Sequence, residues 1–309
     1  MGPVGQRASR NTGPATGGVV AAMFRERLKR FYCKLPVVRE LRDVKAGLDR
    51  LATNQAIRLL DFELRNHPRY GDPKRLLCYH AQVCSQNGED GMIHEIFKRI
   101  GVTTQTFVEI GVGNGHENNT AFLLSQGWRG YWIDAADIFL RALKNRDDIP
   151  KGSLEHRVAS ATKENIATLF EQLNVPRELD FMSLDIDQNT YYIWDGLGGY
   201  RPRVVVVEYN AAIPPDVDWK VRYDPGQTWN HTQNFGASLK AFETLGRTLG
   251  YRLVGCDFMG VNAFFVRDDL VADKFAAPYT SENHYEPPRY SLVHRRLHAA
   301  SILDSRGRE

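Results

Sequence analysis

The chain has 309 residues, of which 42% are hydrophobic and 25% are charged, the balance of a folded protein rather than a disordered or fibrous one. Its net charge of +3 is too small to indicate nucleic acid as a partner. The charge is unevenly divided, because residues 1–76 carry 16 basic and 7 acidic side chains. A basic leader on an acidic body indicates that any peripheral contact with an anionic membrane uses the leader.

The four cysteines, Cys33, Cys78, Cys84 and Cys256, are scattered and form no CxxC pair. They therefore predict neither a disulfide framework nor a structural zinc site, and favour reduced thiols in a cytoplasmic protein. No run approaches the eighteen or so apolar residues that cross a bilayer. The apolar stretch 17–24 is also short for a signal sequence.

The first 66 residues differ in character from the rest of the chain. Residues 1–20 are rich in Gly, Pro and Thr, and we expect a disordered leader there. Residues 21–66 read as a helical extension, in which the apolar residues of 41–51 follow a spacing of three and four before the stripe changes phase. Two heptads fall short of a coiled coil, so the pattern favours an amphipathic helix packed on its own body. A homodimer contact through residues 37–64 and a membrane-surface contact are the alternatives.

Residues 67–275 alternate strand-like and helix-like segments, which indicates βαβ units and a mostly parallel sheet covered on both faces. The last two strands lie too close in the chain for a crossover helix, so the final strand should be antiparallel. Residues 276–309 are expected to form a loosely packed C-terminal extension. The expected strands are 106–110, 130–133, 156–160, 181–186, 204–209, 251–256 and 262–267. The expected helices are 85–100, 118–126, 138–145, 163–173, 191–197 and 237–249.

The first expected strand runs directly into Gly111, Gly113 and Gly115 before a helix. Glycines there permit a tight turn and the close approach of a ligand at the positive end of that helix. The third glycine comes one residue too early for the dinucleotide fingerprint, and Glu109 at the strand end would repel a pyrophosphate. Asp134 ends the next strand, where an acid holds ribose hydroxyls in folds of this kind. A glycine-rich turn that binds nothing is the alternative.

These motifs resemble those of the FkbM-like branch of S-adenosylmethionine-dependent methyltransferases, over roughly residues 75–270. The segments that carry the resemblance are 85–91 (SQNGEDG), 107–115 (FVEIGVGNG), 127–134 (GWRGYWID), 184–187 (LDID), 207–210 (VEYN) and 260–265 (GVNAFF). The resemblance implies a Rossmann-like class I methyltransferase fold, with a seven-stranded sheet whose last strand is antiparallel. It also implies methyl transfer to a hydroxyl group, and we expect a small-molecule or glycan acceptor that presents a sugar.

The resemblance also implies a set of cofactor-binding residues. Glu109 and the first two glycines would surround the amino-acid end of the cofactor, Asp134 would take the ribose, and two small residues after the third strand would lie near adenine. Two polar residues before the first strand would close over the cofactor, or serve only as polar helix residues. The set is Glu109, Gly111, Gly113, Gly115, Asp134, Ala159, Ser160, Gln86 and Glu89.

Asp185, Asp187, Glu208 and Asn210 end the fourth and fifth strands, and adjacent ends of parallel strands open into one crevice. Their oxygens match a hard divalent cation such as Mg²⁺. The rival interpretations are a general base without a metal, and a structural role in which Asp187 caps the next helix. A strand that continues through Asp187 would turn the two aspartates to opposite faces, which favours a site without an obligatory metal. Many FkbM-like relatives have Asp-x-Glu-Gly at this point, so the departure leaves the catalytic details open.

The long polar loop 211–235 is expected to contact the acceptor, because such a loop inside a compact domain is usually functional. Tyr223 and Trp229 suit the apolar faces of a sugar ring, and His231 is a candidate general base, although a lone loop histidine is more often merely solvated. Two other functions stay open. One is a metal-dependent glycosyltransferase that uses the Asp-x-Asp of 185–187, and the other is a non-catalytic protein with a vestigial pocket.

Overall fold

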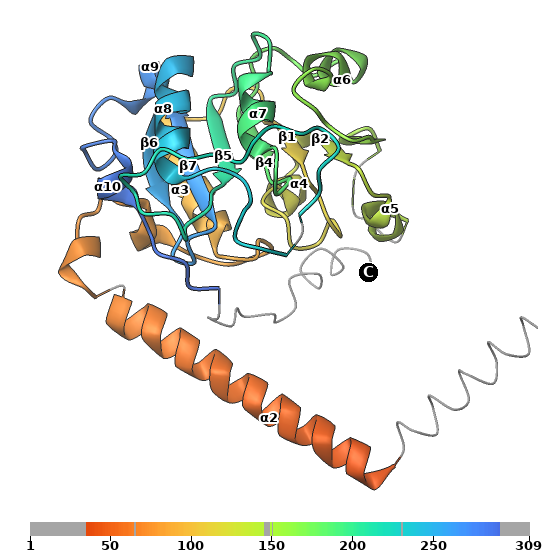
Figure 1. Ribbon diagram of the computed structural model, residues 1–309, viewed down its shortest axis with the longest axis vertical. Coiled ribbons are helices and arrows are strands. Elements are labelled where there is room, and N and C mark those ends of the chain that lie inside the picture. The colour runs from red at the N-terminus through yellow and green to blue at the C-terminus, as the bar shows by residue number, and fades with distance from the viewer. Residues whose placement is uncertain (1–34, 65, 145–148, 150, 230, 291–309) are drawn as a thin grey trace, which may run out of the picture. The chain divides into compact units, whose positions relative to one another are not determined.

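The structure is a computed structural model that describes residues 35–64, 66–144, 149, 151–229 and 231–290 (Figure 1). Residues from Gln55 onward belong to one compact unit, and the residues up to Asn54 belong to another. The expected disordered leader lies outside the described residues. The sheet and the candidate site lie in the unit that begins at Gln55.

Helix α2 (Pro36–Arg58) begins with a proline, whose fixed φ and missing N–H suit the first position of a helix. A π-helical turn, Leu59–Leu64, follows it. Five apolar side chains of α2 alternate spacings of four and three residues, and each is 59–64% exposed. We call these five the α2 seam: Val37, Leu41, Val44, Leu48 and Leu51. No helix in the described part of the chain is both long and apolar enough to cross a membrane.

Seven strands form one sheet in the order β3-β2-β1-β4-β5-β7-β6. The first five strands are parallel to one another, and β7 is antiparallel to both β5 and β6. This arrangement confirms the expected Rossmann-like class I methyltransferase fold with its antiparallel last strand. The order reverses at β1, which lies between β2 and β4, and ligands bind at such switch points in open α/β sheets. The strands are β1 (Thr106–Ile110), β2 (Arg129–Asp134), β3 (Leu154–Val158), β4 (Phe181–Leu184), β5 (Val204–Glu208), β6 (Tyr251–Cys256) and β7 (Asn262–Arg267).

Both faces of the sheet are buried, as the near-continuous apolar run in β5 predicts. Val205 and Val207 belong to the core on one face, whereas Val204 and Val206 belong to the core on the other. Helices α6 (Ile166–Gln172), α7 (Thr190–Asp195) and α8 (Leu239–Leu249) contribute apolar side chains to the first core. The second core receives side chains from α3 (Glu89–Ile100), α4 (Ala121–Ser125), α5 (Ile138–Leu143) and α9 (Asp268–Val271). The two layers fix the sheet, and with it the strand ends that carry the site.

Among the boundaries that differ from the sequence prediction are those of β4, β3 and α3. β4 ends at Leu184 rather than at residue 186, because the next residues leave the sheet. β3 covers Leu154–Val158, two residues earlier than expected, and pairs with β2 over its whole length. α3 begins at Glu89 rather than at residue 85, because the carboxylate of Asp90 accepts hydrogen bonds from the backbone N–H groups of residues 83–85 at 2.6–2.8 Å. These bonds hold the segment before α3 in a tight turn.

Residues 276–290 are packed into the domain, so the expected loose extension is wrong for this part of the tail. Glu286 is fully buried and accepts hydrogen bonds from the hydroxyl of Tyr70 at 2.8 Å and from Arg289 at 2.9 Å. Its backbone carbonyl accepts a bond from the hydroxyl of Tyr209 at 2.7 Å. The segment includes α10 (Ser281–His284), and Tyr70 ends a short 3₁₀ turn, η2 (Pro68–Tyr70). Residues 291–309 lie outside the described residues.

Candidate functional site

The glycine loop after β1 contains three glycines whose surroundings differ. Gly111 has φ +84°, and a β-carbon there would stand 1.6 Å from the carbonyl oxygen of Asp185. Gly113 has φ +61°, and a β-carbon there would meet nothing within 4 Å. A β-carbon at Gly115 would stand 3.1 Å from the ring of Trp132. The loop is therefore packed tightly at Gly111 and open at Gly113.

Glu109, at the inner end of this loop, is buried and turned toward the segment before α4. Its carboxylate accepts hydrogen bonds from the side chains of Asn118 and Thr120, both at 2.5 Å, and from the backbone N–H groups of Asn119 and Thr120 at 3.0 and 3.2 Å. Burial raises the pKa of Glu109 to about 7, although these donors oppose the shift. The structure thus gives Glu109 a positioning role in addition to a place on the cavity wall.

Asp134 ends β2 and receives two backbone hydrogen bonds. The N–H of Gly113 donates to it at 2.9 Å, and the N–H of Ala136 donates at 2.8 Å. An ionised carboxylate offers about four acceptor positions, so Asp134 keeps two for a ligand. Its carboxylate therefore both fixes the open part of the glycine loop and remains able to bind hydroxyl groups.

Two neighbouring cavities lie along the carboxyl ends of β1 and β4. The larger, of about 310 Å³, includes Asp134, Ala159 and Ser160 in its wall, together with residues 225–228 of the long loop. The smaller, of about 150 Å³, is lined on the other side of the loop by residues that include Glu89, Glu109, Asn118 and Asn262. Gly111 and Asp185 line both cavities, so the two spaces meet at the end of β4. Among the predicted cofactor residues, Gln86 lines the smaller cavity and Gly115 lines neither.

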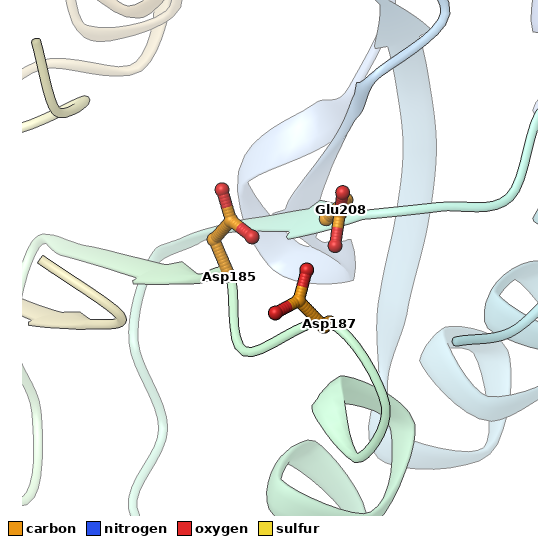
Figure 2. A group of neighbouring side chains, drawn as sticks. All are labelled: Asp185, Asp187 and Glu208. Carbon is orange, nitrogen blue, oxygen red and sulfur yellow. The ribbon is translucent and has the colours of Figure 1, made fainter. Parts of the chain in front are cut away.

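Asp185, Asp187 and Glu208 form a cluster at the ends of β4 and β5 (Figure 2). Each offers a carboxylate oxygen, and these oxygens all lie within 4.8 Å of one another. The convergence arises because the chain leaves the strand after Leu184 and Asp187 adopts the left-handed conformation, with φ +57°. The expectation that the two aspartates point to opposite faces is therefore wrong, and the argument it offered against a metal no longer holds.

The crowding of this acidic cluster changes its protonation. Burial, followed by the charge of Asp187, raises the pKa of Asp185 to about 6. Burial and the charges of both aspartates raise the pKa of Glu208 well above its ordinary value, and a hydrogen bond joins Glu208 to Asp185. Burial also raises the pKa of Asp187, and the nearby charge of His231 opposes that shift. Burial and crowding thus favour the protonated form of Glu208, which can donate this hydrogen bond to Asp185.

The same cluster fits a divalent cation. Oxygens on opposite sides of Ca²⁺ are about 5 Å apart, so oxygens within 4.8 Å of one another can surround that ion, and they would have to approach to about 4 Å to surround Mg²⁺. Asn210, the fourth predicted ligand, is occupied elsewhere. Its amide NH₂ donates to the backbone carbonyls of Gln233 and Phe235 at 2.8 and 3.0 Å, and its oxygen accepts from the N–H of Ala212 at 3.1 Å. Asn210 thus anchors the long loop.

The other predicted loop residues lie near the site without joining the cluster. Tyr223 donates a hydrogen bond to Glu164 at 2.5 Å, and Trp229 donates to the carbonyl of Thr232 at 2.8 Å. His231 is exposed, and its ring centroid lies 4.6 Å from that of Trp229. These contacts hold the loop in shape and leave the rings of Trp229 and His231 accessible.

Asn118 and Asn262 were missed as site residues, although both line the smaller cavity. Asn262 stands in the motif 260–265, which the sequence analysis used only for recognition. Asn118 starts the Asn-Asn-Thr run after the glycine loop, and such polar runs also begin ordinary helices. Neither position carries a spacing signal that points to a ligand.

No protein-family model and no curated protein matches the chain. Similar solved structures include the methyltransferase domain of bacterial CtHen1-C, with 15% identity over 57% of this chain and 95% of that one, at a TM-score of 0.35. TrmK of M. capricolum, bound to S-adenosyl-homocysteine, has 11% identity over 69% of this chain and 81% of that one, at a TM-score of 0.36. The glycopeptide N-methyltransferase MtfA has 13% identity over 62% of this chain and 96% of that one, at a TM-score of 0.33. At these values the likeness assigns neither an activity nor a cofactor to this chain, and the FkbM-like relationship stays an inference from the sequence motifs.

Proposed function

We propose that the chain is an S-adenosylmethionine-dependent methyltransferase that methylates a hydroxyl oxygen. One observation carries the proposal: Gly111 and Asp185 line both cavities, so the acidic cluster adjoins the start of the glycine loop. A cofactor held along the loop and a hydroxyl held at the cluster would then be neighbours. Methyl transfer needs this adjacency, because the oxygen must approach the methyl group in line.

The residues of the larger cavity fit the adenosine part of the cofactor. Asp134 keeps acceptor positions for the two ribose hydroxyls, and Ala159 and Ser160 offer a small-residue wall beside it. When bound, S-adenosylmethionine supplies an electrophilic methyl group on a positively charged sulfur. The protein then has to hold the acceptor hydroxyl in place and to remove its proton.

Asp185 is the proposed proton acceptor. With a pKa of about 6 it is ionised at neutral pH, and it is more basic than an ordinary aspartate. Glu208, whose protonated form is favoured by burial, would donate a hydrogen bond to Asp185 and orient its carboxylate. If Mg²⁺ is present, Asp185, Asp187 and Glu208 would hold it, and the ion would lower the pKa of the acceptor hydroxyl. Whether methyl transfer depends on Mg²⁺ decides between Asp185 as the base and activation of the hydroxyl by the ion.

We propose a sugar hydroxyl, on a glycan or a glycosylated metabolite, as the acceptor. A third cavity of about 280 Å³ adjoins the smaller one, and Gln82, Asn87 and Tyr290 bring amide groups and an aromatic ring to it. Among the described residues that line the three cavities, none is Lys, Arg or His. Such walls suit a neutral, hydroxyl-rich acceptor better than the diphosphate of a nucleotide sugar, which supports methyl transfer over glycosyl transfer.

Calorimetric titration of the purified chain with S-adenosylhomocysteine and with nucleotide sugars tests the class of enzyme. We expect binding of S-adenosylhomocysteine alone, followed by transfer of a labelled methyl group in a screen of glycan acceptors. Binding of a nucleotide sugar instead would favour the glycosyltransferase. Binding of neither ligand would favour a non-catalytic protein.

We also propose that α2 joins two copies of the chain. The α2 seam has the alternating spacing of positions a and d in a coiled coil, and it is exposed in the structure. With Leu41 and Leu48 at position a, Glu40 stands at g and Lys45 at the following e. These positions face each other in a parallel dimer, so each pair of chains would gain two attractions between Glu40 and Lys45. A cytoplasmic location and a membrane contact of the leader stay predictions from the sequence.

A further inference from the structure

Two buried asparagines in the smaller cavity each have an amide oxygen without a hydrogen-bond donor. Asn118 is 8% exposed and Asn262 is 4% exposed. The Oδ1 atoms of both are buried, and no described residue donates a hydrogen bond to either. Leaving a buried amide oxygen unpaired destabilises the fold, so two of them in one cavity indicate a ligand that donates hydrogen bonds.

Two glutamates fix the direction in which these oxygens point. The amide NH₂ of Asn262 donates to Glu89 at 2.7 Å, and that of Asn118 donates to Glu109 at 2.5 Å. Both glutamates also accept backbone N–H groups, and an ionised carboxylate only accepts hydrogen bonds, so each faces the NH₂ side of its amide and leaves the amide oxygen on the other side. Glu89 is itself held by the N–H of Asn87 at 2.7 Å. The pairs Glu89–Asn262 and Glu109–Asn118 thus present two acceptors to one space.

The remaining wall of the cavity favours a cation. Glu117 and Asp185 add carboxylates, and none of the described lining residues carries a positive charge. The volume of about 150 Å³ is a few times the roughly 30 Å³ that one water occupies in the liquid, so it fits a small group rather than a nucleoside. Among the described residues, the group of acidic side chains close enough to hold a metal lies at Asp185, Asp187 and Glu208, outside the two Glu–Asn pairs. An ammonium group, with three donors and one charge, matches the two oxygens best.

We propose that Asn118 and Asn262 bind the α-ammonium group at the amino-acid end of the cofactor. The assignment rests on the proposed function and extends it, because it makes the first residue of β7 a cofactor-binding residue. Adenosine would occupy the larger cavity, and the amino-acid end would pass Gly111 into the smaller one. Glu89 and Glu109 are then positioning residues that act through the two amides.

Three ligands separate the contributions of the two cavities. S-adenosylhomocysteine carries the whole amino-acid end. 5′-S-(3-carboxypropyl)-5′-thioadenosine is the same molecule without the amino group, and 5′-methylthioadenosine lacks the amino-acid end altogether. We expect the unaltered chain to bind S-adenosylhomocysteine about 10- to 100-fold more tightly than the molecule without the amino group, as measured by calorimetric titration.

Variants then assign the difference to residues. Asn262→Ala and Asn118→Ala should each reduce the ratio of the dissociation constants, ligand without the amino group over S-adenosylhomocysteine, by about tenfold. Both variants should leave the affinity for 5′-methylthioadenosine unchanged. Asp134→Ala is the matched control, because it should weaken all three ligands and keep the ratio. A thermal melt with and without 5′-methylthioadenosine shows that each variant is folded.

The outcomes distinguish the two proposals. Equal affinity of the unaltered chain for the ligands with and without the amino group would overturn the ammonium site and leave the methyltransferase proposal intact. An unchanged ratio in both asparagine variants would assign the amino group to other residues. Failure of the unaltered chain to bind any of the three ligands would overturn the proposed function itself. Should an asparagine variant not fold, the ratio measured on the unaltered chain still decides.

Discussion

The carbonyl oxygen of Asp185 fills the space that a side chain at Gly111 would need, since a β-carbon there would stand 1.6 Å away. The end of β4 is thus packed directly against the turn that leaves β1. Gly113, two residues later, has the same left-handed sign of φ but faces open space. One glycine is required by the contact between two strand ends, and the other forms a bare wall where a ligand can approach the backbone.

This contrast predicts opposite results for two alanine substitutions. Gly111→Ala should lower the free energy of unfolding by more than about 3 kcal/mol, because the strand ends must separate. Gly113→Ala should cost only about 1–2 kcal/mol, the strain of a left-handed alanine. Urea denaturation followed by circular dichroism measures both. If both substitutions lowered the free energy of unfolding equally, the contact between Gly111 and Asp185 would not determine the conformation of the loop.

Asp134→Ala should weaken S-adenosylhomocysteine binding by about 1–3 kcal/mol while the fold survives. The carboxylate loses charge-assisted hydrogen bonds to the ribose, and it also releases the N–H of Gly113. Asp137→Ala is the matched control, because its side chain is exposed three residues further on. An unchanged dissociation constant for Asp134→Ala in calorimetric titration would exclude Asp134 from the ribose site.

Asp185→Asn should stabilise the chain at pH 7 and abolish methyl transfer. Asp185 has a pKa of about 6 in the fold against 3.8 when unfolded, so the folded state binds more protons between these values. Wild-type stability therefore falls as pH rises from about 4 to about 6, and the variant escapes this loss. We expect a gain on the order of 1–3 kcal/mol at pH 7 and almost none at pH 4, measured by denaturation in chelator. A variant that is less stable at pH 7 would contradict the crowded cluster.

A chelator decides between a metal and a side-chain base. If Asp185 alone removes the proton, transfer should survive chelation and fall below about pH 6, where Asp185 becomes protonated. Loss of transfer in chelator, with recovery in Mg²⁺, would establish the metal route instead. Binding of S-adenosylhomocysteine in the same chelator is the control, because Asp134 and the glycine loop need no ion.

Charge exchange in α2 tests the parallel dimer. Glu40→Lys and Lys45→Glu should each reduce the dimer fraction of the full chain in light scattering, because like charges then face each other at e and g. The double variant should restore it. Asp49→Lys, at an outer position of the same helix, should change little. A monomeric wild-type chain, or a double variant no better than the singles, would rule this contact out.

Patterns of neighbouring residues in the sequence correctly predicted those strands whose bounds are set by the strand residues themselves. β6 and β7 have the bounds expected from their apolar runs, and Asp134 ends β2 as expected. The meeting of Asp185 with Glu208 also followed from the ends of parallel strands. The direction of Asp187 did not, since period-two reasoning holds only while the strand continues.

The pair Asn118 and Asn262 shows a different limit. Each asparagine is oriented by a glutamate, and Glu89 lies 173 residues before Asn262. No local spacing rule spans that distance, so only the assembled sheet brings the two amides together. Asn210 illustrates the converse, because its sequence position suggested a ligand whereas the fold uses both ends of its amide to anchor a loop.

The hydrogen bond between Tyr70 and Glu286 joins residues that are 216 positions apart. Closing so long a loop is slow, and during synthesis it must wait until residue 286 has left the ribosome. The edge of the domain around Tyr70 and Arg69 therefore stays unpaired while more than two hundred further residues are made. A chain that ends between residues 268 and 285 would keep every strand of the sheet but expose this edge, so we expect proteases to cleave such fragments more readily than the longer chain.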